Sequence, residues 1–177
     1  MPELSRPGEE QSEQRPTLLL LVYSWDMFSA ILAIFEALAP LAGGVAVGVR
    51  MVAVPLVLQL LGALSSAAYA AVLIIVASLL TRRHQWIQRV QVIALGGAIV
   101  LSVVSLVIGY ARGVVDIVPV LTTALIILID LLAIVVMTER RVTAWYSERS
   151  RPPRYVLGTL GFWAVSSVAL IIVDAVR

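Results

Sequence analysis

Long apolar runs separated by short polar segments divide the chain into a regular pattern. The runs extend over about residues 18–39, 54–80, 90–110, 117–137 and 155–176. About 20 apolar residues, at a helical rise of 1.5 Å each, cross a hydrocarbon core of about 30 Å. Each run has that length. The pattern therefore predicts an all-α fold, a polytopic membrane helical bundle of about five transmembrane helices.

The polar segments between the runs suggest a division into four parts. Residues 1–16 hold prolines and glutamates with almost no large apolar side chain, which predicts a disordered cytoplasmic tail. Residues 17–138 contain four runs and are expected to form a four-helix transmembrane core. Residues 139–154 form a charged cytoplasmic linker, and residues 155–177 supply the fifth transmembrane helix.

Two of these parts carry more specific expectations. The fourth helix is expected to continue past residue 138 into the cytoplasm, with Trp145 and Tyr146 near the lipid headgroups, where amphipathic rings are favoured. The fifth helix follows the helix-breaking pair Pro152-Pro153, which suggests that it stands apart from the core and packs on a partner protein.

The segment between the first two runs, residues 40–54, is apolar but rich in glycine. That composition favours a loop packed at the membrane surface over a helix. The alternation of Val45, Val47 and Val49 also allows a short extended piece.

Composition and charge agree with a membrane protein and suggest its orientation. The chain is 60% hydrophobic with a mean hydropathy of +0.99, and its thirteen basic residues are all arginines. Ten of these lie on the side of the N-terminus and three on the other. The positive-inside rule then predicts a cytoplasmic N-terminus and an outside C-terminus in the cell (inner or plasma) membrane. The absence of Lys, Asn and Cys suggests a genome biased toward GC-rich codons, which hints at a bacterial source.

Two aspartates within the apolar runs are the candidates for a functional site. Asp26 and Asp130 each lie about eight residues from the predicted cytoplasmic end of a helix, which is about 12 Å. A carboxylate near the bilayer centre costs about 2.5–3.5 kcal/mol, so both are expected to face the protein interior. If they meet, repulsion favours a shared proton, with Tyr69 as a hydrogen-bonding neighbour.

Other hydroxyl groups that could bond these aspartates are Ser65, Ser66 and Ser102. The functional interpretation is a proton or cation site in a small transporter. The alternative is that each aspartate only hydrogen-bonds a neighbouring helix, a contact worth about 1 kcal/mol in membrane bundles.

Charged residues also lie near the predicted outer ends of the helices. These outer-rim charges are Glu36, Arg50, Arg112 and Asp116, together with Asp174 and Arg177 near the C-terminus. Arg112 and Asp116 are four residues apart, a spacing that allows an ion pair on a helix. Solvated surface pairs and a substrate-recruiting gate both fit this pattern.

The sequence shows no catalytic residues, metal ligands or cofactor motif. Its single histidine, His84, has no acidic residue near it in sequence, and cysteine is absent, which excludes thiolate metal sites and disulfides. A separate basic, aromatic-interleaved domain is also missing, so nucleic-acid binding is not expected. We therefore expect a protein that is not an enzyme.

Small residues recur along the third run at positions Ala94, Ala98, Ser102, Ser105 and Gly109. Such residues let helix backbones approach closely, within this bundle or against another subunit.

Two functional hypotheses remain. The first is an accessory or scaffold subunit of a larger membrane complex, with a membrane-protein partner or a homo-oligomer in the lipid bilayer. The alternative is a small proton- or cation-coupled transporter or channel that uses Asp26 and Asp130.

Overall fold

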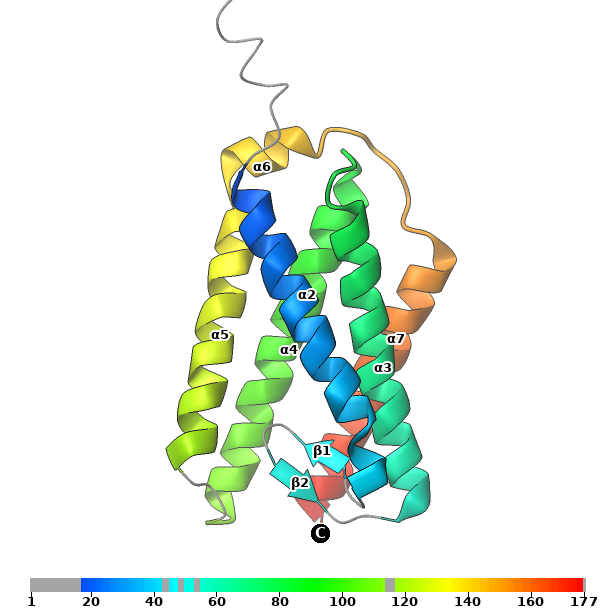
Figure 1. The fold of residues 1–177 in the computed structure, drawn as a ribbon, viewed down its shortest axis with the longest axis vertical. Coiled ribbons are helices and arrows are strands. Elements are labelled where there is room, and N and C mark those ends of the chain that lie inside the picture. The colour runs from blue at the N-terminus through cyan, green and yellow to red at the C-terminus, as the bar shows by residue number, and fades with distance from the viewer. Residues whose placement is uncertain (1–16, 43–44, 48–49, 53–54, 114–116, 177) are drawn as a thin grey trace, which may run out of the picture.

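The computed structural model describes residues 17–42, 45–47, 50–52, 55–113 and 117–176, and it describes side chains throughout these ranges except at positions 41–54. Five helices in these ranges are long and apolar enough to cross a membrane, as predicted: α2 (Leu18–Ala37), α3 (Leu56–Leu79), α4 (Gln85–Ala111), α5 (Ile117–Thr138) and α7 (Arg154–Val176). They lie side by side in one bundle (Figure 1). The fold is therefore an all-α, multi-pass membrane bundle.

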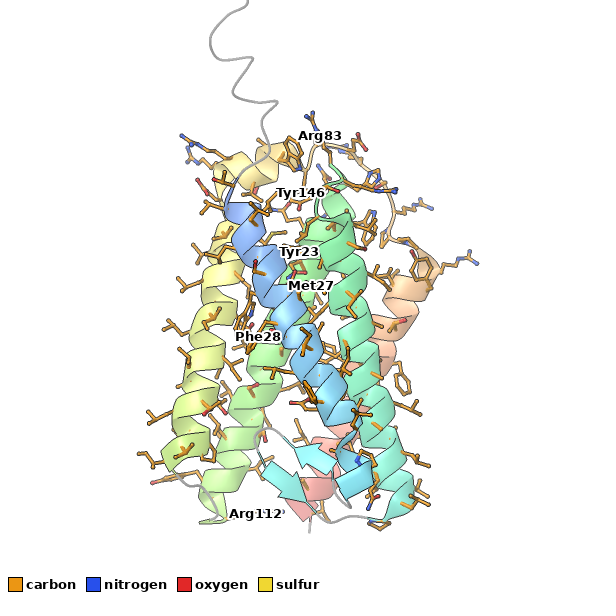
Figure 2. The ribbon with its side chains drawn as sticks, in the orientation of Figure 1. Tyr23, Met27, Phe28, Arg83, Arg112 and Tyr146 are labelled. Carbon is orange, nitrogen blue, oxygen red and sulfur yellow. The ribbon has the colours of Figure 1, made fainter. Side chains whose placement is uncertain are left out.

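Large apolar side chains point outward around this bundle (Figure 2). Examples are Phe35 on α2, Leu121 on α5 and Val165 on α7, each more than 60% exposed. A soluble domain would not leave so much apolar surface uncovered, whereas lipid chains cover it without cost. The outer surface is thus suited to contact with the bilayer.

The end of the bundle that holds the C-terminus also carries a short β-hairpin (Figure 1). After α2, the 3-10 helix η1 (Ala39–Ala42) leads to strands β1 (Val45–Val47) and β2 (Arg50–Val52), which pair antiparallel with Val47 opposite Arg50. The extended alternative that the valine alternation allowed is therefore correct for 45–47. We call this end the hairpin end and the opposite end, where α2 begins, the tail end.

A short helix at the tail end corrects the expected extension of α5. The helix stops at Thr138, because Glu139 has the extended torsions φ −59° and ψ 142°, and α6 (Arg140–Trp145) then lies across the bundle end (Figure 1). Tyr146 is buried, and its hydroxyl donates to the carbonyl of Leu80 at 3.1 Å.

The turn between α3 and α4 is tied to the segment that follows α6. Glu148 and Arg83 are joined by a backbone hydrogen bond of 3.0 Å. The guanidinium of Arg83 lies 4.3 Å from the ring centroid of Trp145. Nδ1 of His84 is 2.9 Å from Oε2 of Glu148, so this histidine does have an acidic neighbour, contrary to the expectation from sequence.

Helix α7 belongs to the bundle and does not stand apart, which corrects the hypothesis based on the proline pair. It packs against α3, where the Ser166 hydroxyl donates to that of Ser65 at 2.9 Å and the Ser167 hydroxyl is 3.0 Å from the same oxygen. Trp163 of α7 reaches the buried core. The pair Pro152-Pro153 precedes the start of α7, and the helix still packs against the rest of the bundle.

The buried apolar core lies mostly in the tail half of the bundle. Its members come from the first half of α2, the second half of α3, the first half of α4, the end of α5 and the start of α7. Five fully buried examples, one from each helix, are Leu19, Val76, Leu95, Met137 and Val156. Large side chains therefore fill the tail half. In the hairpin half, smaller residues face the interior.

Candidate functional site

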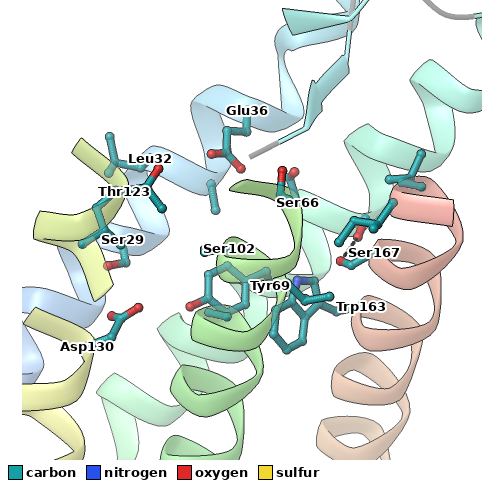
Figure 3. A pocket seen from close by; sticks show the side chains of 18 of the residues that line it. Ser29, Leu32, Glu36, Ser66, Tyr69, Ser102, Thr123, Asp130, Trp163 and Ser167 are labelled. Atoms are coloured by element: carbon teal, nitrogen blue, oxygen red, sulfur yellow. Dashed lines mark hydrogen bonds between the residues drawn. The ribbon is translucent and has the colours of Figure 1, made fainter. Parts of the chain in front are cut away.

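A cavity of about 260 Å³ occupies the hairpin half of the bundle (Figure 3). All five long helices contribute to its wall. The polar and aromatic residues that line it are Trp25, Ser29, Glu36, Ser65, Ser66, Tyr69, Ser102, Ser105, Thr123, Asp130, Trp163 and Ser167. Hydroxyl and carboxylate groups thus converge on one space at membrane depth.

The small residues of α4 explain why the interior is hollow here. Ala98, Ser102, Ser105 and Gly109 all line the cavity, whereas Ala94, one turn nearer the tail end, is buried in the core. The sequence suggested that this stripe brings helices together. In the structure most of it leaves space, because no large side chain from a neighbouring helix fills the volume.

Asp130 lies at the deep end of the cavity. It comes from α5, eight residues before Thr138, and only 3% of its surface is exposed. Nε1 of Trp25 donates a hydrogen bond of 2.7 Å to its Oδ1. The indole N–H therefore holds the carboxylate in place and leaves its second oxygen for another partner.

Asp26 lies next to Trp25 on α2 but does not line the cavity. It is fully buried, and Nε2 of Gln91 donates to its Oδ1 at 2.5 Å. Its Oδ2 and Oε1 of Gln91 have no hydrogen-bond partner among the described atoms. Asp26 and Asp130 are close enough to interact electrostatically. Asp130 lies in the cavity, and Asp26 lies behind its wall.

The donors to both carboxylates are residues that sequence reasoning did not select. The predicted donors were Tyr69 and serines of α3 and α4, whereas Trp25 and Gln91 make the bonds. Gln91 could have been noticed, because it is an amide within an otherwise apolar stretch of α4. The role of Trp25 depends on how α2 is rotated against α5, which no local pattern reveals.

Tyr69 takes part in the cavity wall as an aromatic surface. Its ring stacks on that of Trp163, with centroids 4.6 Å apart and an interplanar angle of 21°. Its hydroxyl points toward Asp130 (Figure 3). The candidate residue thus lies beside the carboxylate.

Glu36 lies near the hairpin end of α2 and lines the cavity, where the Ser66 hydroxyl is its hydrogen-bonding neighbour (Figure 3). Its side chain is exposed, unlike that of Asp130. Glu36 follows Asp26 by ten residues, which is about 15 Å along α2 toward the hairpin end. Glu36 therefore marks the accessible part of the cavity and Asp130 the deep part.

Of the remaining outer-rim charges, Arg112 and Asp174 are described, and neither lines the cavity. Nη1 of Arg112, at the end of α4, is 3.3 Å from Oδ1 of Asp174 on α7, so the two residues form an ion pair between these helices. Asp174 is 8% exposed. The pairing predicted with Asp116 cannot be compared, since Asp116 lies outside the described residues, as does the side chain of Arg50.

The described wall of the cavity carries two carboxylates and no Arg, Lys or His. Thr123, 5% exposed, adds a buried Oγ1 with no hydrogen-bond partner among the described atoms. Within the described part of the chain, no three His, Cys, Asp or Glu side chains gather closely enough to hold a metal ion. Carboxylate and hydroxyl oxygens suit hard or organic cations better than transition metals.

We compared the chain with protein-family models, with curated proteins and with solved structures, and none of the three comparisons found a match. The function must therefore be argued from the geometry of the cavity.

Proposed function

We propose that the protein is a small proton- or cation-coupled transporter whose binding site is the cavity around Asp130. The observation that carries the proposal is a cavity at membrane depth with two carboxylates and no basic residue in its described wall. Ionisable residues within membrane spans commonly face water-filled cavities and belong to ion or proton pathways. A site of this charge attracts cations and excludes anions.

Coupling follows from the cost of an unpaired charge. An ionised carboxylate in the membrane interior is unfavourable unless a cation balances it, so Asp130 alternates between a bound proton and a bound cation. The hydrogen bond from Trp25 keeps the carboxylate in position in both states. Binding of one cation then releases the other, which is the elementary step of exchange.

We propose that access to the site comes from the side of Glu36. This residue lines the cavity near the hairpin end and is exposed, whereas buried apolar side chains such as Leu19, Val76 and Met137 fill the tail half. In this proposal the conformation is open toward the hairpin end. Transport then requires the tail-half core to separate. The arginine distribution favours an orientation with the hairpin end outside the cell.

Proton flux in proteoliposomes tests this proposal. Vesicles that contain the purified protein and a pH-sensitive dye are exposed to an outward proton gradient, with sodium, potassium or a small ammonium ion added outside. We expect at least one cation to drive proton exit, and Asp130→Asn to abolish that exit. Asp174→Asn is the matched control, because Asp174 is an interior aspartate that does not line the cavity. Equal flux for wild type and Asp130→Asn would remove the basis of the proposal.

An accessory or scaffold role is the second candidate. Gly158 and Gly161 on α7 are exposed, and a Cβ built on either would meet no atom within 4 Å. A helix of another protein could approach this face closely. Native mass spectrometry after purification in mild detergent distinguishes the candidates, since the accessory role requires a stoichiometric partner subunit.

A further inference from the structure

The size of the cavity bears on the chemistry of its occupant. A water molecule takes about 30 Å³ of the liquid, and typical pockets for organic ligands begin at about 300 Å³. At about 260 Å³, the cavity is far larger than a single dehydrated ion and close to the lower limit for organic ligands. It fits a small organic molecule.

Aromatic rings form part of the cavity wall. The stacked rings of Tyr69 and Trp163 line the cavity, and the indole of Trp25 adds a further ring next to Asp130. Aromatic faces attract cations and pack well against apolar groups. A simple metal cation would use little of this surface.

The wall also has apolar parts and further hydroxyl groups. Leu32, Leu101 and Ile126 contribute aliphatic surface, and Ser29 and Ser102 contribute hydroxyl groups. Carboxylate, hydroxyl, aromatic rings and aliphatic surface together fit a molecule with one charged and one apolar part.

We infer that the cavity binds a small organic ammonium ion, with its ammonium group at Asp130 and its apolar body against the rings of Tyr69 and Trp163. The inference rests on the proposed cation site and specifies the class of its substrate. Glu36, which lines the cavity nearer the hairpin end, attracts the cation at the accessible part of the cavity. Asp130, which is nearly fully buried, then holds it.

Calorimetric titration of the full chain in lipid nanodiscs tests the inference with three probes. They are 2-phenylethylammonium, the neutral and similarly shaped 2-phenylethanol, and potassium. We expect saturable binding of 2-phenylethylammonium alone. Asp130→Asn is expected to weaken it by about 30-fold or more, as for removal of one partner of a buried charge pair. Trp163→Leu should weaken it by about 2- to 12-fold, the range of a contact between aromatic rings.

Matched controls separate these effects from a loss of folding. Phe162→Leu changes the neighbouring aromatic residue, which is exposed on the outer face of α7, and should leave binding unchanged. Should Asp130→Asn fail to fold, Ser105→Leu fills the cavity while keeping both carboxylates, and it should abolish binding of 2-phenylethylammonium. Ser24→Leu, at an exposed position of α2, is its control.

The outcomes distinguish this inference from the proposed function. Equal binding of 2-phenylethanol would overturn the inference, because the carboxylate would then contribute nothing. Absence of 2-phenylethylammonium binding, together with Asp130-dependent flux driven by potassium or sodium, would overturn the inference and leave the transporter proposal standing. Absence of both binding and Asp130-dependent flux would overturn both.

Discussion

Two adjacent glycines of α4 offer a test of how the aromatic wall is supported. A Cβ added at Gly97 would lie 3.1 and 3.2 Å from two ring carbons of Trp163, whereas a Cβ at Gly96 would meet no atom within 4 Å. The two positions share a helix and a depth in the membrane. Only the neighbour of the added methyl group differs, so Gly96→Ala is a matched control for Gly97→Ala.

The expected magnitudes follow from two opposing effects. Replacing glycine by alanine within a helix stabilises it by about 0.8–1.0 kcal/mol. At position 97 the indole of Trp163 must also retreat by a few tenths of an ångström to reach the normal carbon–carbon separation of about 3.5–4.0 Å. Overpacking of this kind costs about 1–3 kcal/mol. Gly96→Ala should therefore stabilise the protein, and Gly97→Ala should be less stable than Gly96→Ala by about that overpacking cost.

Thermal unfolding in detergent, followed by tryptophan fluorescence, measures the difference. For a chain of this size, 1 kcal/mol corresponds to about 2–4 °C in Tm, so we expect Gly97→Ala to melt several degrees below Gly96→Ala. Because Tyr69 stacks on Trp163, the displacement should also reduce binding of 2-phenylethylammonium. Equal melting temperatures for the two variants would refute the packing of Trp163 against α4.

Three further predictions concern the carboxylates and the topology. Gln91→Leu removes the donor to Asp26 and should lower stability by about 1–3 kcal/mol, measured by the same unfolding assay; an unchanged Tm would contradict the buried hydrogen bond. Trp25→Phe removes the N–H that bonds Asp130 but keeps a ring, and it should weaken cation binding by about 10-fold, with calorimetry as the readout. Because the chain has no cysteine, a single Ser150→Cys can be probed cleanly, and an impermeant maleimide should label it only after cells are opened.

The membrane helices were predictable from sequence because their signal is local. A run of apolar residues has to match the bilayer thickness, and this requirement alone located all five spans. The start of α4 was placed five residues late, since Gln85, Gln88 and Arg89 look like loop residues although all three are good helix formers. No clear signal in the sequence marks the break at Glu139, after which α6 lies across the end of the bundle.

The candidate site was only partly predictable. Asp26 and Asp130 could be selected because a carboxylate in an apolar run is costly wherever it points. Whether each aspartate faces a cavity or a neighbouring side chain depends on how the helices are rotated about their axes. As a result of these rotations, Asp130 lies in the cavity and Asp26 is hydrogen-bonded to Gln91. The serines of α4 were interpreted as packing residues, since a small side chain permits either close contact or space.

Proton–cation exchange in proteoliposomes tests the central claim most directly. Proteoliposomes that contain the protein and a trapped pH-sensitive dye, with an interior more acidic than the medium, are mixed rapidly with 2-phenylethylammonium, sodium or potassium at constant ionic strength. The cation site proposed here predicts proton exit above that of protein-free vesicles in wild type and in Asp174→Asn, and no such excess in Asp130→Asn. The same excess in Asp130→Asn, or none with any cation in wild type, would contradict it.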